Sequence, residues 1–185
     1  LELDVGNTRI KWRRLGPQGT SVASGVEAGK DGVFEFLAQE GVPSRVRISC
    51  VRDQAFRSEL ASAIESCWGL VPEFAESVAS YAGLSNAYAI PEKLGVDRWL
   101  AMLAAQEIAS GKFCVLDAGS ALTLDFVEEG GRHLGGYIVP GLSMQKKVLL
   151  QNTAIRIPEF ESGAQLVPGR STEAAILNGV MSMAI

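Results

Sequence analysis

The chain has 185 residues, 47% of them hydrophobic and 21% charged, so it is long enough for one large domain or two small lobes with a buried core. The net charge of −4, with its basic residues mostly dispersed, argues against nucleic acid as the main partner. No apolar run approaches the roughly 18 residues that a membrane span needs, so we expect no membrane segment either.

Cysteine and histidine usage points away from disulfides and metal centres. Cys50, Cys67 and Cys114 are odd in number, widely spaced and set among apolar neighbours, so we interpret them as buried free thiols in a reducing cytoplasm. His133 has no Cys or His partner at ligand spacing and is interpreted as structural. Asp4 interrupts the opening strand and no basic flank precedes it, which is unlike a signal peptide.

The start of the chain predicts a strand, a tight turn and a second strand. Alternating apolar residues lead to Asp4, and the turn falls on Gly6-Asn7. Glycine can adopt the backbone conformation of a tight turn whose N–H groups point at a phosphate. Thr8 adds a hydroxyl group and Lys11 a positive charge. The pattern indicates a site for nucleotide phosphates, with an ordinary Asn/Gly hairpin as the alternative.

Strands and helices then alternate as far as residue 74. We expect a strand at 20–26, a helix at 32–39, a strand at 46–51, a helix after Asp53 and a strand at 70–74. This order predicts a mixed sheet with helices on its faces.

A looser segment at 77–94 precedes a predicted helix. Tyr88 in this segment either lines a ligand pocket or anchors the loop. The helix opens with Gly95-Val96-Asp97-Arg98 and runs to Ile108. Asp97 suits the positive end of the helix dipole, so capping alone would explain it, whereas Arg98 opposes the dipole and is better explained by an anionic partner.

Residues 113–126 repeat the layout of the opening hairpin. Leu116-Asp117-Ala118-Gly119-Ser120 matches Leu3-Asp4-Val5-Gly6-Asn7 position for position. The repeat predicts two related lobes that face one phosphate chain. Two unrelated surface turns remain the alternative, but they leave the shared Asp-x-Gly unexplained.

The rest of the chain predicts one strand and two helices. The strand covers 132–139, and a helix begins at Pro140-Gly141. Residues 169–173 start the last helix, where Thr172 is either a cap or a ligand contact. That helix reaches the end of the chain without a stop signal, so we expect a fragment of a longer chain.

Four motifs in this order resemble those of type III pantothenate kinase, the Bvg accessory factor family. They are Asp4-Val5-Gly6-Asn7-Thr8, Gly95-Val96-Asp97-Arg98, Asp117-Ala118-Gly119-Ser120-Ala121 and Gly135-Gly136-Tyr137-Ile138-Val139-Pro140-Gly141. The resemblance implies an α/β fold with mixed sheets, that of the acetate and sugar kinase, Hsp70 and actin superfamily. It implies ribonuclease-H-like lobes at 1–111 and 112–185, the second one truncated because family members continue further.

The implied reaction transfers the γ-phosphoryl group of ATP to pantothenate, the first step toward coenzyme A. By resemblance, Asp97 is the proton acceptor, Asp117 binds K⁺ or NH₄⁺, and Asp4 orients hydrated Mg²⁺ on the phosphates. The implied phosphate-binding residues are Asp4, Val5, Gly6, Asn7, Thr8, Arg9, Ile10, Lys11, Gly119 and Ser120, the last in place of the family's usual Thr. The implied pantothenate-binding residues are Tyr88, Gly95, Val96, Asp97, Arg98 and Thr172.

The resemblance also implies a cytoplasmic homodimer. Two alternatives stay open. One is a nucleotide-binding regulatory protein of the same fold without catalysis. The other is a kinase of the same superfold that acts on another small substrate.

Overall fold

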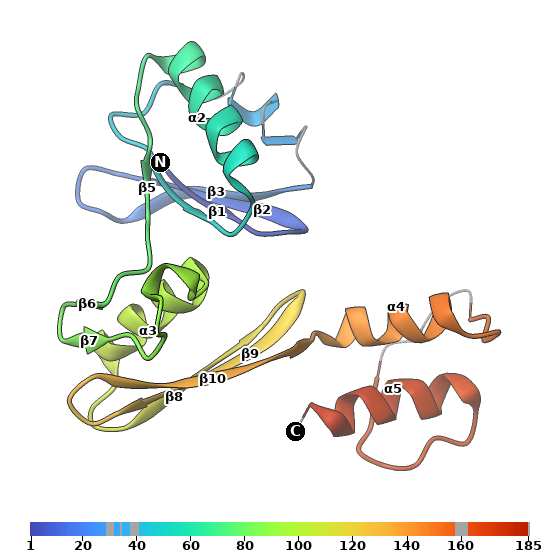
Figure 1. The fold of residues 1–185 in the computed structure, drawn as a ribbon. Helices are drawn as coiled ribbons and strands as arrows, with labels where there is room; N and C mark the ends of the chain where they lie inside the picture. The colour runs from blue at the N-terminus through green and yellow to red at the C-terminus, as the bar shows by residue number, and fades with distance from the viewer. Residues whose placement is uncertain (29–31, 34, 38–40, 158–162, 185) are drawn as a thin grey trace. The chain divides into compact units, whose positions relative to one another are not determined.

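The computed structural model describes residues 1–28, 32–33, 35–37, 41–157 and 163–184 (Figure 1). The chain divides into two compact units. The first unit comprises Leu1–Phe113 and Phe126–Gly135, and the second comprises Cys114–Asp125 and Gly136–Ile185.

The predicted strands and helices occur in the predicted order, and two short strands and a 3₁₀ helix are present in addition between residues 80 and 93. The strands are β1 (Glu2–Val5), β2 (Arg9–Leu15), β3 (Ser21–Ala28), β4 (Arg47–Cys50), β5 (Glu73–Phe74), β6 (Ser80–Tyr81), β7 (Leu84–Ser85), β8 (Phe113–Ala118), β9 (Ala121–Glu128) and β10 (Arg132–Pro140). The helices are α2 (Gln54–Trp68), the short 3₁₀ helix η1 (Pro91–Lys93), α3 (Val96–Ile108), α4 (Leu142–Asn152) and α5 (Thr172–Met183). Residues 32–33 and 35–37 are helical as predicted, and the rest of that expected helix lies outside the described residues.

The first sheet is mixed, with strand order β3-β2-β1-β4-β5. Strand β1 pairs antiparallel with β2 and parallel with β4. Because successive side chains of a strand alternate between faces, Leu3 and Val5 are buried on one face while Glu2 and Asp4 lie on the other.

The core of the first unit lies on the face of this sheet that α2 covers (Figure 1). Helix α2 begins at the N-cap Asp53, whose Oδ1 accepts a hydrogen bond from the backbone N–H of Phe56 at 2.9 Å. Its buried residues Phe56, Leu60 and Ile64 recur at helical spacing and face the sheet.

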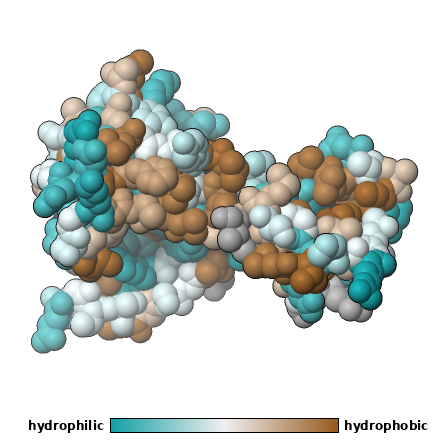
Figure 2. All heavy atoms as spheres, turned by 90° about the horizontal axis from the view of Figure 1, so that it is seen from below, coloured by the Kyte–Doolittle hydropathy of each residue, from teal (hydrophilic) through white to brown (hydrophobic). Residues whose placement is uncertain are grey.

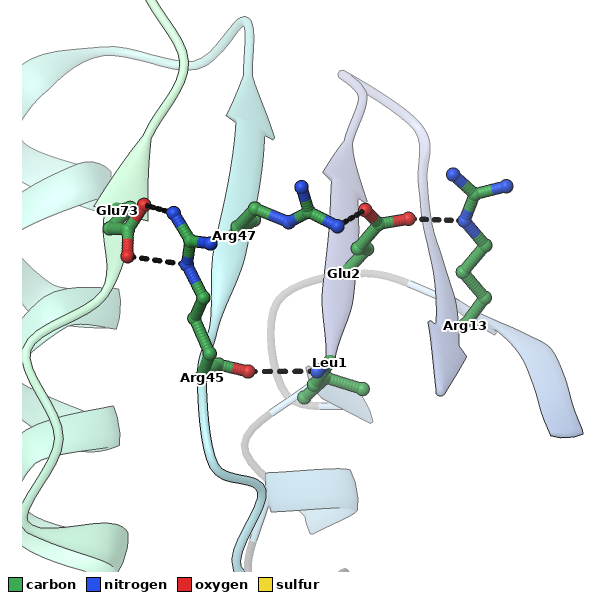
Figure 3. A network of polar contacts seen from close by, with 6 residues as sticks. All are labelled: Leu1, Glu2, Arg13, Arg45, Arg47 and Glu73. Atoms are coloured by element: carbon green, nitrogen blue, oxygen red, sulfur yellow. Dashed lines mark hydrogen bonds and ion pairs between the residues drawn. The ribbon is translucent and has the colours of Figure 1, made fainter. Parts of the chain in front are cut away.

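Charged side chains join the strands on the opposite face. The Glu2 carboxylate forms ion pairs with Arg13 of β2 through Oε2 and with Arg47 of β4 through Oε1 (Figure 3). The distance from Arg47 Nη2 to Oε1 is 2.5 Å. The strand register places all three residues side by side. This network favours the register in which Asp4 lies opposite Lys11.

The second sheet has strand order β6-β7-β10-β9-β8. The segment expected to be irregular contributes the short strands β6 and β7, and β7 pairs parallel with β10 through Ser85 and Arg132. Gly131, at φ +80°, permits this approach because a Cβ there would lie 2.1 Å from the carbonyl oxygen of Gly83.

The second unit carries many apolar side chains on its surface. Exposed ones include Met144, Val148 and Leu149 on α4 and Met183 on α5, and Figure 2 shows apolar surface over the part that holds these helices. None of the helices in the described ranges is long and apolar enough to cross a membrane.

The expectation of three buried thiols is wrong for two of them. Cys50 is buried, and its burial raises the pKa of the thiol, but Cys67 and Cys114 are exposed. Apolar neighbours along the chain do not decide burial: the core-facing positions of α2 are held by other residues, and Cys114 lies with Leu116 on the exposed side of β8.

Candidate active site

The first predicted phosphate turn is a tight connection between β1 and β2. The backbone N–H of Gly6 donates to the carbonyl of Arg9 at 3.1 Å, which closes the turn over Asn7 and Thr8. Both of these residues are exposed. The turn therefore lies at the surface of the unit, where a loop that binds an anion through backbone amides has to lie.

Asp4 and Lys11 flank this turn on the outward face of the sheet. They lie opposite each other in the pairing of β1 with β2, and Lys11 Nζ is 3.9 Å from Asp4 Oδ2. The side chain of Lys11 is 68% exposed and that of Asp4 is 50% exposed. Ser49 lies opposite Asp4 on β4, and its buried Oγ has no hydrogen-bond partner among the described residues. A carboxylate, an ammonium group and an unsatisfied hydroxyl thus share one face at the turn.

Arg52 is a residue of this region that the sequence reasoning missed. Its Nε donates to the carbonyl of Gly6 at 2.9 Å and its Nη2 to the carbonyl of Asn7 at 3.4 Å. Its guanidinium carbon lies 4.5 Å from the centre of the Phe56 ring. No sequence signal connects Arg52 to the turn, because 45 residues separate it from Asn7.

The predicted base, Asp97, lies in the first turn of α3 and is exposed. Its Oδ1 accepts a hydrogen bond from the backbone N–H of Arg98 at 2.8 Å. A Cβ on Gly95 would lie 2.6 Å from that oxygen. Asp97 is not the N-cap, which is Gly95, but it lies in the first turn, where the helix dipole favours an acid, and it satisfies one amide there. Gly95 leaves room for its carboxylate. Helix α3 also comes close to β4, the parallel neighbour of β1.

Arg98 is buried, with 6% of its surface exposed, and contacts Tyr88. Its Nη1 donates to the Tyr88 hydroxyl at 3.0 Å, and its guanidinium carbon lies 5.9 Å from the ring centre. The His133 ring also stacks on Tyr88, with 6.4 Å between the ring centroids and 13° between the ring planes. Tyr88 is thus held by both neighbours, which supports the anchoring interpretation and leaves a pocket role open.

The loop that carries Tyr88 is fixed by further hydrogen bonds. Asn86 accepts from the Tyr88 backbone N–H at 3.0 Å through Oδ1, and its Nδ2 donates to the carbonyls of Val78 and Pro91. His133, 2% exposed, accepts from the Ala87 backbone N–H at 3.3 Å through Nδ1. The histidine expected to be structural therefore supports a predicted substrate residue.

The second predicted phosphate turn connects β8 and β9 in the second unit. The Gly119 backbone N–H donates to the carbonyl of Ala121 at 2.9 Å, and the Ser120 carbonyl accepts from the backbone N–H of Gly141 at 3.0 Å. Asp117 precedes the turn at an exposed position. Both hairpins expected from the repeat are present, but two residues separate the strands here and three separate β1 from β2.

Thr172 is the first residue of α5 and is not its cap. The cap is Ser171, whose Oγ accepts from the Ala174 backbone N–H at 3.1 Å. Thr172 instead borders a cavity of about 630 Å³ between α4 and α5, which is lined mostly by apolar side chains such as Val148 and Ile176. The capping alternative is wrong, and the ligand-contact alternative stays a prediction.

Comparison with known proteins decides the family. A family model described as type III pantothenate kinase matches residues 1–185. The chain belongs to this family. The match confirms the family identified from the four sequence motifs.

Curated relatives described as type III pantothenate kinases agree. One from Halorhodospira halophila is 37% identical over 97% of this chain and 74% of its own length. One from Pseudomonas aeruginosa is 38% identical over 99% of this chain and 76% of its own length. The chain therefore spans about three quarters of these relatives.

A solved structure from Campylobacter jejuni, described as a Baf family transcriptional activator, has the same fold. Its TM-score is 0.60 at 21% identity, covering 98% of this chain and 74% of that chain. This likeness confirms the predicted α/β fold with two mixed sheets. The sequence predictions that the two turns face one phosphate chain, and that the lobes divide at 111/112, stay predictions.

Proposed function

We propose that this chain transfers the γ-phosphoryl group of ATP to the 4′-hydroxyl of pantothenate, the first step toward coenzyme A. The observation that carries the proposal is the family match over residues 1–185. Within that family the chain keeps an acid in the Gly95-Val96-Asp97-Arg98 segment, and the Asp97 carboxylate is exposed where a substrate can reach it.

Asp97 acts as the general base. Its carboxylate accepts the proton of the substrate hydroxyl as that oxygen bonds to the γ-phosphorus and the bond to the ADP oxygen breaks. General-base catalysis of this kind contributes about 10²–10⁴-fold in rate. The hydrogen bond from the Arg98 backbone N–H keeps the carboxylate oriented.

The two turns hold the phosphates of ATP. In the first, backbone amides near Asn7 and the ammonium group of Lys11 neutralise charge, which is most of what phosphoryl transfer requires. Residues Asp4 to Lys11, with Gly119 and Ser120 from the second turn, form the proposed ATP site.

The residues fit the cations that the family implies. Among the residues described, no cluster of three or more His, Cys, Asp or Glu could hold a metal by itself. Mg²⁺ needs only one or two carboxylates beside phosphates and waters, and half-exposed Asp4 next to the unsatisfied Ser49 hydroxyl suits a hydrated ion. Asp117 offers the carboxylate for a monovalent cation, K⁺ or NH₄⁺. Bound Mg²⁺ would neutralise phosphate charge.

Tyr88, Gly95, Val96, Arg98 and Thr172 form the proposed pantothenate site. The buried Arg98 guanidinium suits a carboxylate-bearing substrate because its planar fork matches a carboxylate. We also propose a cytoplasmic homodimer. The cytoplasmic location is supported by the three cysteines, all of which are free. The dimer is supported by α3, where Leu100 is exposed although Trp99 beside it is buried.

The alternative of a regulatory protein without catalysis rests on no observation in this structure, since the Campylobacter jejuni likeness concerns the fold alone. An alternative substrate is separated from pantothenate by assaying a panel of small alcohols and acids.

The decisive experiment is Asp97→Asn in an assay that couples ADP release to pantothenate addition. We expect kcat to fall by about 10²–10⁴-fold with little change in the KM for ATP. Asp53→Asn is the matched control, because it makes the same change at the start of α2, where Asn caps equally well. Wild-type turnover by Asp97→Asn would remove Asp97 from the base role, and no turnover by the unaltered protein would contradict the kinase proposal.

A further inference from the structure

Arg52 follows the end of β4 and lies next to the first phosphate turn. The Val51 backbone N–H donates to the carbonyl of Val5 at 3.1 Å, which extends the pairing of β4 with β1 to the edge of the turn. Asp53 then caps α2. A strand end and a helix start therefore fix the backbone of Arg52 on both sides.

The side chain is fixed as well. Its guanidinium lies over the ring of Phe56, a buried residue of the core, and the side chain is partly buried. From this platform Nε donates to the Gly6 carbonyl and Nη2 to the Asn7 carbonyl. One planar group thus contacts two successive carbonyls of the turn, which suits the fork of donors that arginine presents.

These two contacts determine where the neighbouring amides point. No cis peptide bond occurs among the described residues, and in a trans peptide the C=O and the N–H point in opposite directions. Because the Gly6 carbonyl faces Arg52, the Asn7 N–H is directed away from it. Because the Asn7 carbonyl faces Arg52, the Thr8 N–H is directed away as well.

We propose that Arg52 is a positioning residue for nucleotide binding: it holds the Gly6 and Asn7 carbonyls so that the Asn7 and Thr8 amides donate to a phosphate of ATP. The inference rests on the proposed kinase function. Arg52 acts through the backbone of the turn, so its effect depends on the two-point contact and not on its charge alone.

Lysine separates these two contributions. Arg52→Lys keeps the positive charge but replaces the rigid planar fork with one ammonium nitrogen on a flexible stem, so two fixed donor nitrogens no longer hold the two carbonyls. Arg52→Gln removes the charge too. We expect both variants to bind ATP about tenfold more weakly, the change that corresponds to one lost hydrogen bond, while the KM for pantothenate stays unchanged.

Arg57 provides a matched control. Its guanidinium carbon lies 4.7 Å from the centre of the Phe74 ring and it forms an ion pair with Glu76. Among the described residues its side chain makes no hydrogen bond to the turn. Arg57→Lys and Arg57→Gln remove an arginine that stacks in the same way. They should leave the dissociation constant for ATP at the value of the unaltered protein.

The test combines calorimetric titration of ATP with ¹⁵N NMR of the backbone amides. In the unaltered protein the Asn7 and Thr8 amide signals should shift when ATP is added, and in Arg52→Lys these shifts should shrink while the melting temperature shows a folded protein. Wild-type ATP affinity and wild-type shifts in Arg52→Lys would overturn the positioning role. If the unaltered protein itself binds no ATP, the proposed function fails instead.

Discussion

A steric contact explains why residue 95 of the Gly95-Val96-Asp97-Arg98 segment is a glycine. A Cβ on Gly95 would lie 2.6 Å from Asp97 Oδ1, and the next nearest atoms, Asp97 Cγ and Arg98 Cδ, are 3.8 Å away. The obstructing atom is thus the end of the proposed catalytic side chain. The backbone of α3 does not obstruct the new carbon.

We therefore predict that Gly95→Ala impairs catalysis far more than folding. The carboxylate can rotate away from the new methyl group, so the free energy of unfolding should change by less than about 1 kcal/mol. Moving the base by about 1 Å should lower kcat by about 10²-fold. Steady-state kinetics and urea denaturation measure the two effects.

Gly41→Ala is the control for this change, because in the described part of the chain no atom beyond the immediate neighbours lies within 4 Å of a Cβ placed at Gly41. Gly41→Ala should change neither kcat nor the free energy of unfolding. A Gly95→Ala enzyme with the kcat of the unaltered protein would show that the orientation seen for Asp97 does not matter for the reaction.

At the scale of elements, the β8–β9 turn depends on its contact with the start of α4. Gly141 precedes α4 and donates to the Ser120 carbonyl. A Cβ on Gly141 would lie 2.3 Å from the Gly119 oxygen and 2.7 Å from the Ser120 oxygen. Both oxygens belong to the backbone, so neither can move unless the turn itself moves.

Gly141→Ala should consequently displace the second phosphate turn. We expect a destabilisation of about 1–3 kcal/mol, as for other overpacked sites, together with a higher KM for ATP. Urea denaturation and kinetics with varied ATP are the measurements.

Gly179→Ala in α5, which lies in the same unit, is the control for Gly141→Ala. Apart from the backbone of α5 itself, no atom of the described residues lies within 4 Å of a Cβ placed at Gly179, so the substitution should stabilise the helix by up to about 1 kcal/mol. Equal effects of the two alanines would contradict the steric explanation for Gly141.

At the scale of the whole molecule, one exposed ion pair makes stability depend on pH. Arg45 donates from Nε and Nη2 to the two carboxylate oxygens of Glu73 at 2.6 and 2.5 Å (Figure 3). These hydrogen bonds hold the pKa of Glu73 below its ordinary value of 4.5. A carboxyl whose pKa is lowered by folding stabilises the folded state above the pKa of the unfolded chain.

The contribution of the Arg45–Glu73 pair to the free energy of unfolding should be lost as the pH falls through the lowered pKa of Glu73. Glu73→Gln should therefore be less stable than the unaltered protein at pH 7, and the difference should disappear in acid. Urea midpoints at a series of pH values test this, and added salt should reduce the difference because the pair is exposed. Glu65→Gln makes the same change at an exposed position of α2 and controls for the loss of a surface carboxylate as such.

Local patterns predicted much of the fold from the sequence. The alternation around Asp4, the helical spacing of Phe56, Leu60 and Ile64, and the cap at Asp53 each depend on neighbours a few residues away. The repeated Asp-x-Gly predicted two hairpins, and both are present. It did not predict that β1 would lie inside its sheet while β8 lies at an edge, because strand order depends on segments that join later in the chain.

The sequence by itself determined the family, the order of elements and the candidate acids, since these follow from periodicity, turn chemistry and four ordered motifs. Only the tertiary structure decided which cysteines are buried, why Gly95 has no side chain, and which residues support the site. Arg52 reaches the first turn, and His133 reaches Tyr88, across separations of about 45 residues. Such contacts are set by how strands and helices pack, and packing brings together residues whose spacing along the chain carries no signal.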